Sequence, residues 1–92
     1  MIMADKRVLS KEYWDWRNAV IKRDKGKCQY PGCKRKKGVQ VHHIIRWADC
    51  YDLRYSVKNG LCLCRICHRK ITGNETLYSD LFMTIVQSKE KR

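Results

Sequence analysis

The sequence contains no apolar run that approaches the roughly 20 residues a helix needs to span a bilayer, so we expect no membrane-spanning segment. Residues 1–9 carry charges and no long apolar stretch, which predicts that a secretory signal is absent and that the protein is cytoplasmic. No internal repeat is visible, and 43% hydrophobic with 33% charged residues is not the composition of a disordered tract. These absences leave one small domain over residues 1–92, whose ends at 1–9 and 88–92 we expect to fray.

Acidic residues are scarce as well, because 9 Asp and Glu stand against 21 Lys and Arg and leave a formal net charge of +12. The excess is concentrated in the segment from Lys22 to Lys37, where Asp24 is the one acid. Clustered positive charge attracts phosphate backbones, which favours a nucleic-acid partner over an ordinary solvated basic surface. Binding to an anionic membrane would need an amphipathic basic helix, and Pro31 and Gly32 interrupt this segment.

Cysteine, by contrast, is plentiful, with six residues in a chain of 92. Four of them form two short knuckles, Cys28-Gln-Tyr-Pro-Gly-Cys33 and Cys64-Arg-Ile-Cys67, each of which can present two thiolates to one ion. Four thiolates suit a structural, tetrahedral Zn²⁺ site, and such an ion would stabilise a chain too short for a large core. A disulfide scaffold is disfavoured because no export signal is seen, and a redox role for the second knuckle leaves the first unexplained.

Two cysteines, Cys50 and Cys62, lie outside these knuckles. Cys62 shares a strand face with Cys64 and could compete with it as a ligand. We interpret both residues as buried thiols, which behave as small hydrophobic side chains.

Capping residues and periodicity predict a chain that mixes helices and strands. Ser10 starts a helix that ends at about Lys25, and its aromatic residues are interpreted as core. A β-branched run predicts a strand over 39–45, followed by a loop over 46–58. Asn59-Gly60 predicts the turn of a hairpin, and residues 61–63 form its returning strand.

Two further helices follow the hairpin. The first is predicted over 66–72 and ends at Gly73, and Asn74 caps the second. The second helix has an apolar stripe that consists of Leu77, Tyr78, Leu81, Phe82, Ile85 and Val86.

All three histidines lie within this predicted hairpin and the helix after it. Val41-His42-His43-Ile44, then Asn59-Gly60, then Leu63-Cys64-Arg65-Ile66-Cys67-His68, with Arg23-Asp24 upstream, resemble the pattern of the HNH endonuclease family. The resemblance extends over about residues 13–76 and is strongest to small free-standing HNH proteins of bacteriophages. It implies an α+β, ββα-metal (His-Me finger) fold, in which a hairpin and a helix clamp a catalytic metal ion. Here the core would be stabilised by a four-cysteine zinc site and flanked by N- and C-terminal helices.

The resemblance also implies a role for each of the motif residues. His43 would be the general base, since imidazole can take a proton at neutral pH, and Asn59 would orient it. His42 and His68 would hold a catalytic Mg²⁺ or Mn²⁺ ion. Many members have Asp at the position of His42, and some have a further His where this chain has Thr72. Two imidazoles without a carboxylate also suit Ni²⁺ or Co²⁺.

Adjacent residues of a regular strand point to opposite faces, so His42 and His43 can serve one site only if the hairpin is strongly twisted or distorted. Basic residues near the motifs are candidates for contacts with DNA, since guanidinium and ammonium groups bind phosphate. Those nearest the scissile phosphate would be Arg46, Arg65 and Arg69, and a more distant backbone-contacting patch would consist of Lys34, Arg35, Lys36 and Lys37.

The favoured function is therefore a metal-dependent DNA endonuclease that nicks or cuts duplex DNA. The alternative is a zinc-containing module that binds nucleic acid without catalysis. That module would need the knuckles and the basic residues but not His42, His43 and His68 together, so the histidines favour the enzyme. The sequence leaves the target site, the oligomeric state and the biological role open.

Overall fold

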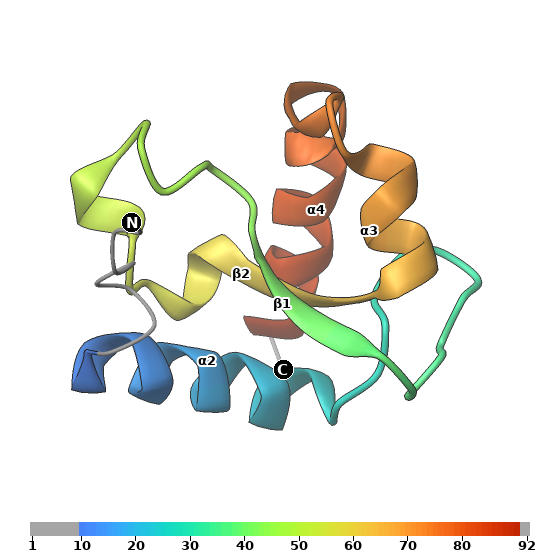
Figure 1. Ribbon diagram of the computed structural model, residues 1–92, viewed down its shortest axis with the longest axis horizontal. Helices are drawn as coiled ribbons and strands as arrows, with labels where there is room; N and C mark the ends of the chain where they lie inside the picture. Colours follow the sequence, from blue (N-terminus) through green and yellow to red (C-terminus); the bar gives the residue numbers. More distant parts are fainter. Residues whose placement is uncertain (1–9, 91–92) are drawn as a thin grey trace, which may run out of the picture.

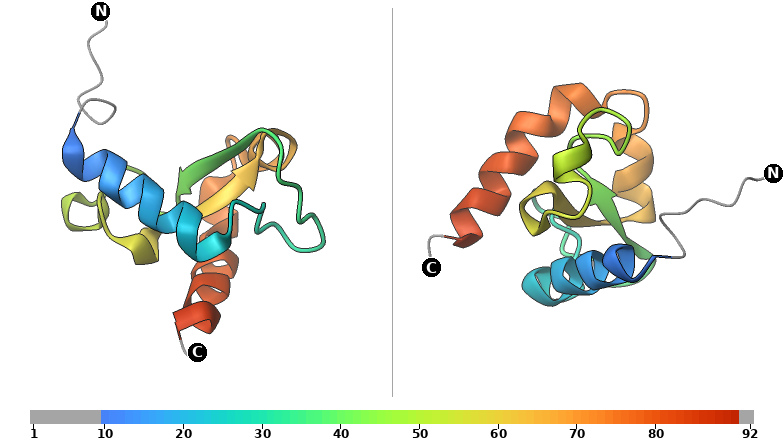
Figure 2. Two further views of the ribbon diagram at one scale, coloured as in Figure 1. Left: turned by 90° about the horizontal axis from the view of Figure 1, so that it is seen from below. Right: turned by 90° about the vertical axis from the view of Figure 1, so that its left-hand side faces the viewer.

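The computed structural model describes residues 10–90, with side chains as far as Lys89. A two-stranded antiparallel sheet lies between helix α2 (Lys11–Asp24) on one side and helices α3 (Arg65–Ile71) and α4 (Glu75–Glu90) on the other (Figure 1). The two views of Figure 2 show the same layering from below and from the side. This α+β arrangement of a hairpin with a following helix is consistent with the predicted ββα-metal fold.

The two strands are β1 (Val39–His43) and β2 (Gly60–Cys64), and their register pairs Val39 with Cys64 at one end and His43 with Gly60 at the other. Every residue of β2 is buried, because both of its faces are covered. On one face Leu61 and Leu63 pack in the cluster with the α3 and α4 side chains. On the opposite face Cys62 packs against the side chains of α2. Strand alternation thus sends neighbouring residues of the hairpin to different helices.

The predicted turn at Asn59-Gly60 is wrong. Asn59 ends a short 3₁₀ turn, η2 (Val57–Asn59), and Gly60 is the first residue of β2 with extended backbone angles. The connection between the strands is instead the long loop 44–59, which also contains a second 3₁₀ turn, η1 (Tyr51–Leu53). The first strand is shorter than the predicted range 39–45, because its pairing with β2 ends at His43.

Helix α2 follows the prediction closely. The Ser10 Oγ accepts a hydrogen bond from the Tyr13 backbone N–H at 2.9 Å, and Lys25 caps the other end in the left-handed conformation at φ 58°. Trp16 and Val20 are buried, as the core interpretation requires, whereas Trp14 is exposed.

Helices α3 and α4 confirm the expected order of elements with two differences. Phe82 and Val86 are buried, but Leu77 and Leu81 of the predicted stripe are exposed. Helix α4 also continues to Glu90, so residues 88–90, which were expected to fray, are helical. The fraying expected of residues 1–9 concerns a segment outside the described residues. Within residues 10–90, none of the helices has the length and apolarity needed to cross a membrane.

Candidate metal centres and histidine site

The four knuckle cysteines meet at one point. Cys28 and Cys33 come from the loop after α2, Cys64 ends β2, and Cys67 lies in the first turn of α3. Their sulfurs all lie within 4.8 Å of one another, and the Cys33 and Cys64 sulfurs are 3.7 Å apart. Sulfurs bound at about 2.3 Å to a tetrahedral zinc ion would be separated by about 3.8 Å. The cluster could therefore hold a metal ion such as zinc, as the spacing predicts.

The thiols of this cluster influence one another. Burial raises the pKa of Cys64, but hydrogen bonds from the Cys67 backbone N–H and from the neighbouring thiols outweigh it and lower that pKa to about 6. Burial raises the pKa of Cys28 and of Cys67. Four adjacent sulfurs do not ionise together without a counter-charge, and a bound cation supplies one.

The remaining cysteines lie outside the cluster. Cys62 is fully buried on the α2 face, where burial and the charge of Asp24 raise its pKa to about 12. Cys50 is half-buried before η1. This placement agrees with the interpretation of Cys62 as a buried thiol.

His42 and His68 lie side by side on the α3 and α4 face of the hairpin. Their ring centroids are 5.5 Å apart with an interplanar angle of 73°, and the Phe82 ring flanks His42 at 5.9 Å. His42 is 8% exposed, and its Nε2 finds no hydrogen-bond partner among the residues that are described. Burial and the nearby charge of His68 lower the pKa of His42 to about 4, although the charge of Glu75 opposes this shift.

The buried Nε2 provides a test of whether these residues fit a metal ion. A buried nitrogen without a partner costs folding free energy, on the order of 1–3 kcal/mol. The low pKa keeps the ring neutral at physiological pH, which is the form that binds metal. The His68 imidazole beside it could supply a second nitrogen ligand, so the chemistry of the pair is compatible with a divalent cation.

His43 leaves β1 on the opposite face, toward α2. Its imidazole stacks on the Trp16 indole with centroids 3.9 Å apart and an angle of 15°. The Trp47 ring meets it in a T-shaped contact with centroids 5.7 Å apart. Its Nε2 is 2.8 Å from the backbone carbonyl of Arg54. A carbonyl can only accept, so this nitrogen carries the proton and Nδ1 is the basic nitrogen of the neutral ring.

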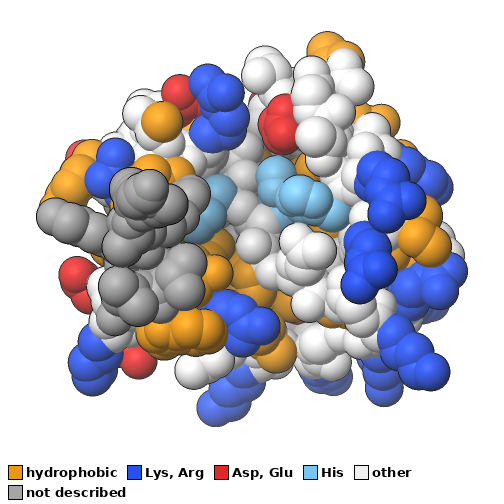
Figure 3. All heavy atoms as spheres, in the orientation of Figure 1, with side chains coloured by type: hydrophobic (Ala, Val, Ile, Leu, Met, Phe, Trp, Pro, Cys, Tyr) orange, Lys and Arg blue, Asp and Glu red, His pale blue; other side chains and the backbone are white. Residues whose placement is uncertain are grey.

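Both histidines stay in regular register with β2, so the pairing of β1 is not interrupted between them. Figure 3 shows histidine side chains at two places on the same face, separated by backbone and other atoms. A substrate lying across this face could contact both places.

Asn59 ties together the loop that ends next to His43. Its side-chain Oδ1 accepts from the Ile45 backbone N–H at 2.7 Å, and its Nδ2 donates to the carbonyls of Ile45 at 3.0 Å and Leu53 at 3.1 Å. Ile45 follows shortly after His43 in the chain, and Leu53 precedes Arg54. The amide therefore fixes both segments that determine where the His43 ring lies.

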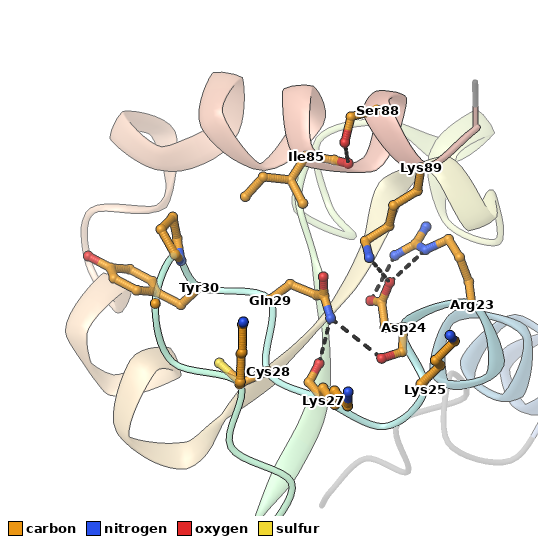
Figure 4. A pocket seen from close by; sticks show the side chains of 13 residues that line it. Arg23, Asp24, Lys25, Lys27, Cys28, Gln29, Tyr30, Ile85, Ser88 and Lys89 are labelled. Atoms are coloured by element: carbon orange, nitrogen blue, oxygen red, sulfur yellow. Dashed lines mark hydrogen bonds and ion pairs between the residues drawn. The ribbon is translucent and has the colours of Figure 1, made fainter. Parts of the chain in front are cut away.

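Arg23 and Asp24 hold the beginning of β2. Arg23 pairs with the buried Asp24 carboxylate and also donates to the carbonyls of Val57 and Gly60, while Asp24 accepts from the Cys62 backbone N–H. In Figure 4, Lys89 of α4 approaches the same carboxylate, at 3.8 Å. Beside this network lies a groove of about 590 Å³, whose lining includes the basic residues Arg23, Lys25, Lys27, Lys34 and Lys89.

The predicted DNA-contacting residues are all at the surface. Arg46 forms an ion pair with Asp49, with Nε and Oδ2 2.9 Å apart, and Arg65 and Arg69 are exposed on α3. Residues 34–37 are exposed in the loop between the first knuckle and β1. Figure 3 shows Lys and Arg side chains gathered on the side of the molecule where α3 and this loop lie.

Sequence reasoning missed three contributors to the histidine site. The Arg54 carbonyl leaves no signal in the sequence, because every residue has a backbone carbonyl. Trp16 was interpreted as core only, although its buried ring also contacts His43. Glu75, in the first turn of α4, accepts a hydrogen bond from the Gly73 N–H at 3.1 Å. Its charge acts to raise the pKa of His42, so the site has a carboxylate in its surroundings.

Comparison with known proteins supports the interpretation of this region. The profile of the HNH endonuclease family matches residues 13–71, which include both knuckles and all three histidines. Searches of curated proteins and of solved structures found no match.

Proposed function

The chain belongs to the HNH endonuclease family, and on this premise we propose that it is a metal-dependent endonuclease that hydrolyses phosphodiester bonds in DNA. The observation that carries the proposal is the arrangement of the histidines. Beside His68, His42 presents a buried Nε2 that has no hydrogen-bond partner in the described part of the chain. His43, the next residue of β1, is held by a hydrogen bond to the Arg54 carbonyl. A domain that only binds nucleic acid has no use for either feature.

His42 and His68 would hold the catalytic divalent ion, Mg²⁺ or Mn²⁺, with Ni²⁺ and Co²⁺ also compatible with two imidazoles. When bound, such an ion supplies charge stabilisation at the phosphoryl group and at the leaving oxygen. The neutral state of His42 leaves its lone pair available, and the Phe82 ring beside it restricts access of bulk water.

His43 would take a proton from the attacking water at Nδ1. Its Nε2–H donates to the Arg54 carbonyl, which holds the ring in the tautomer that leaves Nδ1 basic. Asn59 keeps Arg54 in place through the Leu53 carbonyl. General-base assistance of this kind is worth about 10²–10⁴-fold in rate.

The cysteine cluster would hold a structural Zn²⁺ ion that joins the first knuckle to the end of β2. The exposed basic residues Lys34, Arg35, Lys36, Lys37, Arg46, Arg65 and Arg69 would contact DNA phosphates. These contacts would carry little sequence information, so modest sequence specificity is expected.

Incubation of zinc-loaded protein with supercoiled plasmid, in separate reactions with Mg²⁺, Mn²⁺, Ni²⁺ and Co²⁺, tests the proposal. Conversion to nicked or linear plasmid is expected with at least one ion, and not in a reaction of the zinc-loaded protein to which no further divalent ion is added. A folded protein that binds the plasmid but leaves it supercoiled with every ion would overturn the enzyme and favour the non-catalytic zinc module. A His68→Ala variant is the matched control, since it keeps all four cysteines.

A further inference from the structure

We propose that Trp16 is a positioning residue for His43, whose imidazole it holds in one plane through direct ring stacking. The inference rests on the proposed function, in which His43 is the base. It concerns a residue of α2, far from the histidine motif in sequence, that contacts no predicted metal ligand in the described contacts.

The geometry of the pair is that of an offset-stacked or parallel ring contact. The two ring centroids are 3.9 Å apart and the planes differ by 15°, and Trp16 is 2% exposed. The indole cannot swing away, because its Nε1–H donates to the Ser56 carbonyl at 2.7 Å. The stacking surface is therefore itself fixed within the protein.

Gly60 explains how an indole from α2 reaches this place. His43 and Gly60 face one another in the register of the sheet, and directly opposed residues of antiparallel strands share a face. A Cβ at position 60 would lie 2.7 Å from Trp16 Cζ2 and 2.8 Å from Val20 Cγ2, closer than real contacts allow. The indole thus occupies the space where the cross-strand neighbour of His43 would otherwise be.

Two of the contacts that His43 makes constrain the direction of Nδ1. The hydrogen bond from Nε2 to the Arg54 carbonyl fixes one atom of the ring but leaves rotation about that bond. The stacked indole removes this rotation, because a tilted imidazole would collide with it. Ser56, which anchors the indole, and Arg54, which anchors the imidazole, belong to the same loop, so both constraints are set by one segment.

Trp16 is also part of the core, so its replacement lowers stability whatever its role. Three variants separate the two effects. Trp16→Phe keeps an aromatic surface but lacks the N–H, Trp16→Leu keeps an apolar side chain without a ring, and Val20→Ala removes buried volume from the same helix face beside the same glycine. Each is assayed for plasmid nicking at a temperature at which thermal unfolding shows it to be folded.

Trp16→Leu should lower kcat about 10- to 100-fold while KM changes less than about twofold, as expected for a displaced catalytic group. Trp16→Phe should retain most of the kcat, and Val20→Ala should lose stability with kcat unchanged. Full kcat in Trp16→Leu, or an equal loss in Val20→Ala, would overturn the positioning role.

Nuclear magnetic resonance of the histidine ring protons gives a readout that does not depend on activity. The stacked indole should shift the His43 signals upfield of those of His68, and Trp16→Leu should abolish the shift. Unshifted His43 signals in the wild type would overturn the proposal even if the protein cuts DNA. Upfield signals in a protein that cuts no DNA would instead overturn the proposed function, so the two failures are distinguishable.

Discussion

The cysteine cluster lies at the end of the hairpin where Val39 pairs with Cys64. His42 and His43 lie at the other end, where His43 pairs with Gly60. At the cysteine end, two local knuckles bring four sulfurs within 4.8 Å of one another. At the histidine end, two adjacent side chains go to opposite faces. His42 contacts side chains of α3 and α4, whereas His43 contacts α2 and the loop 44–59.

Under the proposed function, this difference separates a stabilising site from a catalytic one. The cysteine cluster cross-links segments that a small core holds weakly, so an ion there contributes directly to folding. The histidine end contains a buried nitrogen that has no partner among residues 10–90, which opposes folding. Groups that lower stability persist where a ligand uses them, and the pair His42 and His68 fits that description.

The largest expected effect is at the cysteine end. Cys64→Ser should lose the bound zinc and unfold, since structural zinc contributes on the order of 10 kcal/mol of apparent free energy coupled to folding. Zinc content by mass spectrometry and helical signal by circular dichroism measure both. Cys50→Ser is the control and should keep the metal. A Cys64→Ser protein that is folded and zinc-loaded would refute this ligand set.

At the histidine end, His42→Leu should lower activity without lowering stability. Plasmid nicking should fall by about 100-fold or more, because loss of a metal ligand should cost at least as much as the roughly 10–100-fold lost when a residue that supports a ligand is removed. The free energy of unfolding should stay the same or rise by about 1 kcal/mol, because the unpartnered nitrogen is removed from an apolar site. Urea unfolding of the zinc-loaded protein, without any other added divalent ion, measures stability. A loss of several kcal/mol would make His42 a structural residue and erase the contrast between the two ends.

The loss of stability in Asn59→Ala should lie between those of Cys64→Ser and His42→Leu. The substitution removes three hydrogen bonds to buried or partly buried backbone groups, and the free energy of unfolding should fall by about 3 kcal/mol. Urea denaturation checks the value against Asn18→Ala, an exposed position on α2. A change equal to that of the control would mean that the loop 44–59 does not depend on this amide.

Little effect on stability is expected from the basic residues near the cysteine end. Replacement of residues 34–37 by Gln should change the free energy of unfolding by less than about 0.5 kcal/mol, because all four are exposed. The slope of log K against log salt for duplex DNA should become shallower by up to about 3.6, which is about 0.9 for each phosphate that is no longer neutralised. Fluorescence anisotropy over a salt series measures the slope, and Lys58→Gln is a single-charge control. An unchanged slope would remove these residues from the DNA interface.

The cysteine end could be predicted from the sequence because its ligands are set by short spacings. The knuckles of Cys28 with Cys33 and of Cys64 with Cys67 form a cluster as expected. The capping of α2 by Ser10 was equally local. Position 60 shows where local reasoning failed, since Asn-Gly favours a turn but this glycine instead admits the Trp16 ring.

The histidine end could be recognised by family resemblance but not assembled from the sequence. The partner of the His43 ring is a backbone carbonyl, and its stacking surface comes from a helix that lies well before the histidine motif in the chain. Leu77 and Leu81 had the spacing of core residues yet are exposed, because α4 meets the hairpin through Phe82 and Val86. Such contacts depend on tertiary packing, which overrides local pattern.

The most direct test of a catalytic histidine end with an independent structural cysteine end is plasmid nicking by His43→Ala. The variant should keep its zinc and its fold, while the nicking rate in Mg²⁺ or Mn²⁺ falls about 10²–10⁴-fold below that of the wild type. A zinc-loaded, folded His43→Ala protein that nicks plasmid as fast as the wild type would contradict the role of His43 as the general base.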